Sequence, residues 1–151
     1  MCDSTTTNES SLTFQHSSKK SFGTGDGFYN PKMSIGRDLA VLAAIEHCHQ
    51  LKKRQNGYDT IRLLDGFSGV GVLALRWAST LSSHFNSTFE ITANDRSKIC
   101  QKYITNNIQT NNINSRNVFV TGQDVNCILS KDAVTPNRRP FDMIHLDPFG
   151  C

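Results

Sequence analysis

The chain has 151 residues, of which 37% are hydrophobic and 19% are charged, and its net charge is +3. This composition is typical of one globular domain and excludes a highly charged, disordered chain. Five widely spaced cysteines without a Cys-x-x-Cys pair argue against a disulfide framework or a zinc site, and no apolar run approaches the length of a membrane span.

The first part of the chain is predicted to be a tail followed by a helix. Residues 1–27 are rich in Ser, Thr, Gly and Asn, and we interpret them as a flexible tail outside the domain. The Asn30-Pro31 pair predicts an extended loop that presents aromatic side chains. A helix is predicted to begin near Ser34, which would act as its N-cap. Its predicted buried face comprises Ile35, Leu39, Leu42 and Ile45.

The rest of the chain alternates between predicted strands and helices. The predicted strands are Ile61–Leu64, Phe89–Ala93, Val118–Thr121 and Phe141–Leu146. The helix predicted between the first two strands has an apolar stripe made by Val72, Leu75, Ala78 and Leu81. The strand ends are about 26 to 29 residues apart, which is typical of repeated strand–helix units in a parallel sheet. We therefore predict an α/β fold with about four parallel strands and helices on both faces. Because such a sheet normally has further strands, residues 28–151 would be the N-terminal part of a larger catalytic domain.

Four carboxylates are predicted at the carboxyl ends of these strands, where parallel sheets bind ligands: Asp65, Asp95, Asp124 and Asp147. Asp65 opens the turn Gly66-x-x-Gly69-x-Gly71, which has neither the glycine order of a dinucleotide fingerprint nor the lysine of a phosphate loop. Gly69 and Gly71 would let the backbone approach a ligand. An acid beside this turn would repel a pyrophosphate but suits S-adenosylmethionine, which carries an amino group and a sulfonium. A simple tight turn is the alternative.

The next two strand ends have candidate contacts for a nucleoside. Asp95 follows Gly71 by 24 residues, near the spacing of acids that hydrogen-bond ribose hydroxyls. Asp124 would accept a hydrogen bond from the adenine amino group, and the Val125 backbone amide would donate to a ring nitrogen. For both acids the alternative is a helix N-cap.

The segment Asp147-Pro148-Phe149-Gly150 is the predicted catalytic element. The exocyclic amine of a base is a weak nucleophile, because its lone pair is delocalised into the ring. Asp147 and the Pro148 carbonyl would accept the amine protons and so free that lone pair for reaction. Phe149 would stack on the extruded base.

Together, several segments resemble the tRNA (guanine-26-N2)-dimethyltransferase family over about residues 28–150. The matching segments are Phe28-Tyr29-Asn30-Pro31-Lys32-Met33, Arg37-Asp38, Asp65–Gly71 with Ala74-Leu75-Arg76, Ala93–Ser97 and Phe141–Gly150. The resemblance implies the first half of a Rossmann-like class I methyltransferase sheet. It also implies S-adenosylmethionine-dependent methylation of the N2 amine of guanine 26 in tRNA.

The resemblance adds roles that the spacing of the residues does not provide. Arg37 would bind the cofactor carboxylate, and Arg76 would do likewise, although the family often has an arginine where this chain has Leu73. Phe28 would line the guanine pocket opposite Phe149. We expect tRNA as partner, no metal and no membrane contact, in the nucleus, the cytoplasm or the mitochondrion. The alternatives are methylation of another base or a protein amine, and a non-catalytic module that binds cofactor or RNA. Whether one or two methyl groups are added stays open.

Overall fold

The computed structural model describes residues 4–18, 27, 29–53, 60–85, 88–136 and 139–148. Within these ranges the central sheet has four strands in the order β5-β4-β3-β6, and every neighbouring pair is parallel. The strands are β3 (Thr60–Asp65), β4 (Thr88–Asn94), β5 (Val118–Thr121) and β6 (Met143–His145). The predicted α/β fold with a parallel sheet is confirmed.

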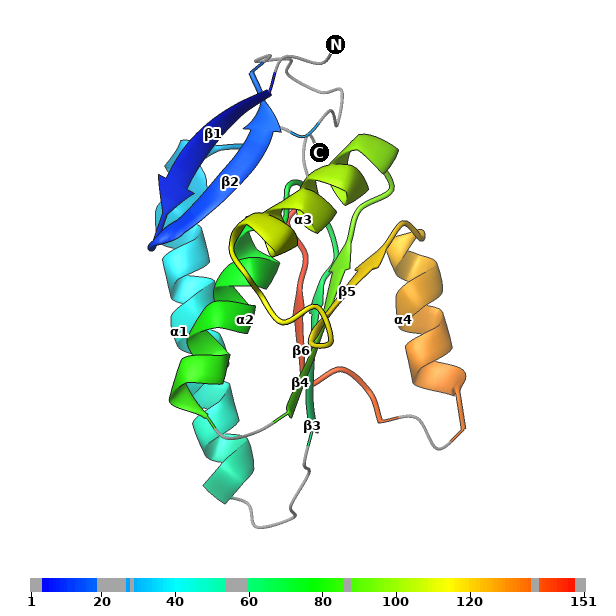
Figure 1. Ribbon diagram of the computed structural model, residues 1–151. Helices are drawn as coiled ribbons and strands as arrows, with labels where there is room; N and C mark the ends of the chain where they lie inside the picture. The colour runs from blue at the N-terminus through cyan, green and yellow to red at the C-terminus, as the bar shows by residue number, and fades with distance from the viewer. Residues whose placement is uncertain are drawn as a thin grey trace.

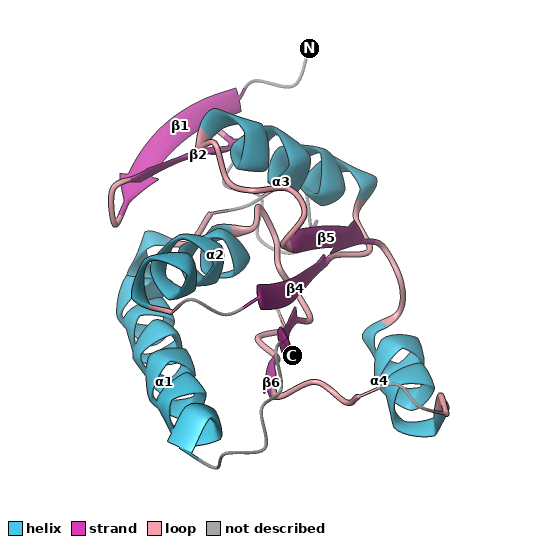
Figure 2. Ribbon diagram, turned by 60° about the horizontal axis from the view of Figure 1, so that its bottom comes forward, coloured by secondary structure: helices cyan, strands magenta, loops and turns pink. Residues whose placement is uncertain are grey.

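Helices cover both faces of this sheet (Figures 1 and 2). The helices α1 (Ser34–Lys53), α2 (Val72–His84) and α3 (Lys98–Thr110) lie on one side, and α4 (Val125–Val134) lies on the other. A buried ion pair ties α4 to the sheet, because Arg62 Nη1 in β3 lies 2.9 Å from Asp132 Oδ1 in α4. Three crossover connections join the parallel strands, from β3 to β4, from β4 to β5 and from β5 to β6, and each contains one described helix.

The core between the sheet and α2 matches its predicted pattern. Val72, Leu75, Ala78 and Leu81, the predicted apolar stripe of α2, are all buried. Trp77 is also fully buried, and it meets Leu63 of β3 and Ile91 of β4 in one hydrophobic cluster.

α1 begins at Ser34 as predicted, but Ser34 has helical backbone angles and is not the N-cap, and the buried face of α1 was predicted wrongly. Asn30 supplies the cap by accepting a hydrogen bond from Lys32 N, in a short 3-10 helix η1 (Pro31–Met33) that leads into α1 at Ser34. Ile35, Leu39 and Leu42 are 70%, 62% and 61% exposed. The buried residues of α1 are instead Ala40, Val41, Ala44 and Cys48. These small side chains allow close approach to α2, and the indole nitrogen of Trp77 donates to the Ala40 carbonyl at 3.2 Å.

The N-terminal segment is a β-hairpin, so the prediction of a flexible tail is wrong for residues 4–18. Strands β1 (Ser4–Glu9) and β2 (Leu12–Ser17) pair in antiparallel register and pack beside α3 (Figure 1). Leu12 and Phe14 are 7% and 0% exposed and belong to the main core. The boundary expected between residues 27 and 28 therefore does not separate a tail from the domain.

Two asparagines, Asn107 in α3 and Asn111 at the C-cap of α3, explain why so polar a segment can pack against the domain. Asn107 accepts from Gln15 N at 2.7 Å and donates to Gln15 O at 3.1 Å. Asn111 likewise accepts from Thr13 N and donates to Thr13 O, both at 2.7 Å. The two amide side chains thus bond the backbone N–H and C=O groups at the outer edge of β2, as a neighbouring strand would.

Candidate functional site

The glycine turn after β3 is held in place by the end of β4. Ser68 N donates to the Asn94 carbonyl at 2.8 Å, and Gly71 N donates to the Ser68 carbonyl at 2.8 Å. Gly69 and Gly71 have φ angles of +54° and +87°, a backbone conformation that favours glycine. A Cβ on Gly71 would also lie 3.2 Å from the side chains of Ile104 and Leu75. Conformation and packing both explain glycine at position 71.

A cavity of about 50 Å³ lies beside this turn and brings several predicted site residues together. Arg37, Asp65, Gly69 and Asp147 line it, so α1, β3, the turn and the end of β6 converge on one space. One wall carries a guanidinium and the others carry carboxylates, a combination that suits a zwitterion. A larger cavity of about 300 Å³ lies under α4 and contains none of the predicted site residues.

His145 also lines this cavity and was not predicted from the sequence. It is the cross-strand partner of Asp65, and its Nδ1 lies 3.5 Å from Asp65 Oδ1. Contact with the Asp65 carboxylate raises the pKa of His145 against the opposing effect of burial, and Asp147 adds to the rise. Nδ1 is buried and makes no hydrogen bond to the residues that the structure describes. Asp65 itself is buried and accepts from Ser68 Oγ at 2.8 Å through Oδ2.

Asp95 is bound to the glycine turn itself. Its Oδ2 accepts from Gly69 N at 2.9 Å, and its Oδ1 accepts from Ser97 N at 2.9 Å. Burial raises the pKa of Asp95, although both amide hydrogen bonds oppose the rise. Ser97 caps α3 by accepting from Cys100 N, so the N-cap alternative does not describe Asp95.

Asp124 and Val125 lie outside the cavity. Asp124 is the N-cap of α4, where its Oδ1 accepts from Asn126 N at 2.9 Å, and its Oδ2 lies 3.5 Å from exposed Arg96. Val125 is buried at the first turn of α4. For Asp124 the helix-cap alternative is therefore realised in this structure.

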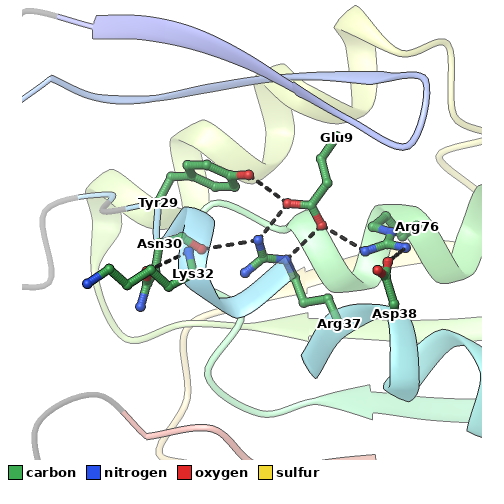
Figure 3. A network of polar contacts seen from close by, with 7 residues as sticks. All are labelled: Glu9, Tyr29, Asn30, Lys32, Arg37, Asp38 and Arg76. Carbon is green, nitrogen blue, oxygen red and sulfur yellow. Dashed lines mark hydrogen bonds and ion pairs between the residues drawn. The ribbon is translucent and has the colours of Figure 1, made fainter. Parts of the chain in front are cut away.

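The two predicted arginines meet on one carboxylate, that of Glu9 at the end of β1 (Figure 3). Arg37 donates from Nε to Glu9 Oε1 at 2.8 Å and from Nη2 to Oε2 at 2.5 Å. Arg76 donates from Nη1 to Glu9 Oε1 at 2.7 Å and from Nη2 to Asp38 at 2.5 Å. Arg37 lines the cavity, whereas Arg76 is buried behind it.

Sequence reasoning missed Glu9 because it lies in the segment interpreted as a tail. The alternation of Leu12 and Phe14 with polar residues is a strand signal that could have revealed the hairpin.

The remaining predicted residues belong to the same end of the sheet or to undescribed positions. Pro148 follows Asp147 beyond β6 and is exposed. Phe28 and Phe149 lie outside the described residues. Across the part of the chain that is described, no group of three or more His, Cys, Asp or Glu side chains forms a candidate metal site. None of the described helices is both long and apolar enough to cross a membrane.

The parallel sheet order, the glycine turn and the acids at the strand ends define a Rossmann-like domain of the class I methyltransferase type. The chain belongs to the N2,N2-dimethylguanosine tRNA methyltransferase family, whose model matches residues 8–151. The resemblance seen in the sequence is thereby confirmed, and the family match includes most of the hairpin.

Two relatives illustrate the match. The tRNA (guanine(26)-N(2))-dimethyltransferase of Methanocaldococcus jannaschii is 32% identical over 123 residues, which are 82% of this chain and 29% of that protein. The tRNA (guanine(27)-N(2))-dimethyltransferase of Bos taurus is 28% identical over 148 residues, covering 83% of this chain and 17% of that protein. The chain thus spans less than a third of the length of either relative.

Two solved structures share the fold. Trm5b from Pyrococcus abyssi gives a TM-score of 0.56 at 18% identity, covering 81% of this chain and 28% of that one. TYW2 from M. jannaschii, crystallised in complex with AdoMet, gives 0.51 at 16% identity, covering 80% of this chain and 43% of that one. At these identities the likeness shows the fold alone.

Proposed function

We propose that this chain carries the cofactor-binding part of an enzyme that methylates the N2 amine of guanine 26 in tRNA with S-adenosylmethionine. The observation that carries the proposal is the cavity in which Arg37, Asp65 and Asp147 meet beside the glycine turn. Membership of the family supports the substrate class, and the archaeal relative is named for position 26. A tRNA substrate restricts the enzyme to compartments that hold tRNA, namely the nucleus, the cytoplasm or the mitochondrion.

The residues of the cavity fit the amino-acid end of this cofactor. Arg37 would bind its carboxylate and Asp65 its ammonium group, because each offers the opposite charge at the cavity wall. His145 lies beside Asp65 at the same wall, with 3.5 Å between Nδ1 and Oδ1. When bound, the cofactor supplies an electrophilic methyl group.

Other predicted residues would hold the nucleoside. Asp95 would bind the ribose hydroxyls through the lone pairs that its two amide hydrogen bonds leave unused. Asp124 and the Val125 amide would contact the adenine, and Gly69 and Gly71 would permit close approach of the backbone. Arg76 would support the carboxylate contact from behind Glu9 rather than from the cavity wall.

Asp147 and its neighbours would act on the guanine amine. The Asp147 carboxylate lines the cavity at the end of β6, where it would accept a proton from the amine and so increase its nucleophilicity. The Pro148 carbonyl would accept the second amine hydrogen. Phe149 and Phe28 would stack against the base.

A transfer assay with altered tRNA tests the proposal. Purified protein is incubated with methyl-labelled S-adenosylmethionine and tRNA transcripts that carry guanine or adenine at position 26. Label on the guanine-26 transcript alone is expected, and nucleoside chromatography then distinguishes one added methyl group from two. Label that depends on guanine 27 would assign the position named for the Bos taurus relative. Cofactor binding without transfer to any tRNA would contradict the proposal and favour a non-catalytic module.

Replacing Asp147 tests its catalytic role. Asp147→Ala removes the proton acceptor, so transfer to tRNA should fall by about 10²- to 10⁴-fold, while S-adenosylhomocysteine still binds. Glu46→Gln, an exposed change on α1, serves as the matched control and should retain full activity. A parallel loss of ligand binding in Asp147→Ala would move Asp147 from catalysis to cofactor binding.

A further inference from the structure

Glu9 is a buried carboxylate that joins four separate segments of the chain (Figure 3). It accepts from Arg37 of α1, from Arg76 of α2 and from the Tyr29 hydroxyl, the last at 2.7 Å. Its own side chain, at the end of the hairpin strand β1, is only 8% exposed. Such a buried acid is stable only when opposite charges and hydrogen-bond donors satisfy both of its oxygens.

The charges around Glu9 balance. Burial alone would raise the pKa of Glu9, but hydrogen bonds from Arg37, Tyr29 and Arg76 outweigh it and hold the pKa below its ordinary value. Glu9 and Asp38 provide two negative charges against the two positive charges of Arg37 and Arg76. The group is therefore an ionised network rather than a neutral packing contact.

The contacts of Arg37 show which part of its guanidinium is held. Nε and Nη2 form a two-point contact with Glu9, and Nη2 also donates to the Asn30 carbonyl at 3.1 Å. The ring of Tyr29 lies 5.2 Å from the guanidinium carbon. The hydrogen bonds that Arg37 makes to Glu9 and Asn30 come from Nε and Nη2 and leave Nη1 out. Nε and Nη2 of Arg37 are thus held by the protein, and the N–H groups of Nη1 can donate to a ligand.

We propose that Glu9 is a positioning residue, which holds Arg37 so that Nη1 is presented to the carboxylate of the bound cofactor. This inference rests on the proposed function, in which Arg37 binds that carboxylate. Arginine loses considerable side-chain freedom when it is immobilised, so an arginine that is already held binds its ligand more tightly. Glu9 itself does not line the cavity, whereas Arg37 does. It therefore supports Arg37 from behind rather than occupying the ligand's place.

The proposal also gives the N-terminal hairpin a function. Glu9 is the last residue of β1, and β2 is anchored to the domain by Phe14 and by the side chains of Asn107 and Asn111. Anchoring β2 fixes β1 through the antiparallel pairing of the two strands. The hairpin thus delivers one carboxylate to the back of the cofactor site.

Two ligands that differ only at the amino-acid end test the inference. S-adenosylhomocysteine carries the carboxylate, and 5′-methylthioadenosine has the same nucleoside and thioether without it. Glu9→Gln should weaken binding of S-adenosylhomocysteine about tenfold, because the two-point charged contact with Arg37 is lost. Binding of 5′-methylthioadenosine should stay unchanged. Both affinities are measured by calorimetry on the full chain, with Glu46→Gln as control.

The other outcomes are separable. Unchanged or tighter binding of S-adenosylhomocysteine to Glu9→Gln would overturn the inference, and tighter binding would show that Glu9 competes with the ligand. Equal weakening of both ligands would also overturn it, in favour of a structural role. If circular dichroism shows that Glu9→Gln does not fold, Glu9→Asp replaces it, because aspartate keeps the charge but has a shorter side chain. Binding of the same two ligands to Glu9→Asp is then compared. No binding of S-adenosylhomocysteine by the unmodified protein would instead refute the proposed function.

Discussion

His145 and Asp65 form a titratable pair at the wall of the candidate site. They are direct partners on the adjacent parallel strands β6 and β3, with 3.5 Å between Nδ1 and Oδ1. The other groups that face His145 are the Asp147 carboxylate beyond the end of β6 and the ring of Trp77 in α2, which lies edge-on at 6.3 Å. The imidazole therefore lies near two carboxylates, and these favour its protonated form.

This pair should make the stability of the protein depend on pH in a defined direction. Because Asp65 raises the pKa of His145 above its ordinary value, the folded protein binds this proton more tightly than the unfolded chain does. The stabilising contribution is complete below about pH 6.5 and is lost as the pH rises through the folded value. Urea unfolding at several pH values should show the stability difference between the unmodified protein and His145→Gln shrinking as pH rises.

A second background checks the origin of that effect. In Asp65→Asn the carboxylate is absent. Adding His145→Gln to that variant should therefore change the free energy of unfolding by an amount that depends much less on pH. If the effect of His145→Gln on the free energy of unfolding were constant from pH 6 to pH 9, both with Asp65 and with Asn at that position, the ion pair between His145 and Asp65 would be refuted.

The residues of the site were predictable to different degrees. Asp65 and Asp147 could be placed at one edge because parallel strands end at the same side of a sheet, and the cavity contains both. Arg76 was expected at the ligand but is turned toward Glu9 and Asp38. No sequence rule gives the direction of a long side chain that has an acid on each of two sides, so the structure was needed to show that Arg76 contacts Glu9 and Asp38.

At the scale of elements, the hairpin turn holds two of the three non-glycine residues with positive φ in the described chain. Ser10 and Ser11 form a two-residue loop with φ angles of +50° and +66°. Positive φ at both loop residues is typical of the type I′ turn, which matches the twist of the flanking strands but favours Asn and Gly. Two exposed serines in this conformation therefore cost folding free energy.

Replacing Ser11 by glycine should stabilise the protein. Ser11→Gly relieves the left-handed strain of about 1–2 kcal/mol and adds some unfolded-chain entropy, so a net gain of about 0.5–1 kcal/mol is expected. The gain is measured as a higher urea midpoint. Ser11→Ala keeps a Cβ at the same φ and should give no gain. A lower midpoint for the glycine variant would mean that the serine hydroxyl contributes more than the strain costs.

Elements with regular neighbours were easier to predict than elements with unusual ones. The stripe of α2 was correct because a helix that packs on a sheet buries large apolar residues at helical spacing. In α1 the same spacing selected Ile35, Leu39 and Leu42, but the face with small residues is the one that contacts α2. One face of that helix carries large apolar side chains and another carries small ones, and periodicity alone does not show which face is buried.

At the scale of the whole molecule, the hairpin and the sheet share one core. Phe14 of β2 and Trp77 of α2 are both fully buried and belong to the same hydrophobic cluster. The sheet was predicted from its repeating units, but the hairpin was not, since the backbone at the edge of β2 is hydrogen-bonded by the side chains of Asn107 and Asn111 and not by another strand. Long-range contacts of this kind leave no periodic pattern in the sequence.

A shared core predicts that the hairpin and the sheet unfold together. Phe14→Ala removes a fully buried ring, so it should lower the free energy of unfolding by about 3–5 kcal/mol. Fluorescence of Trp77, the one tryptophan, and far-ultraviolet circular dichroism should then report the same, lower urea midpoint, as a two-state transition requires. Phe119→Ala, at a position 47% exposed on β5, should change that midpoint little. If the hairpin were a separate unit, Phe14→Ala would leave the Trp77 transition where it is, because the side-chain contacts of Trp77 include Ala40 of α1 and His145 of β6.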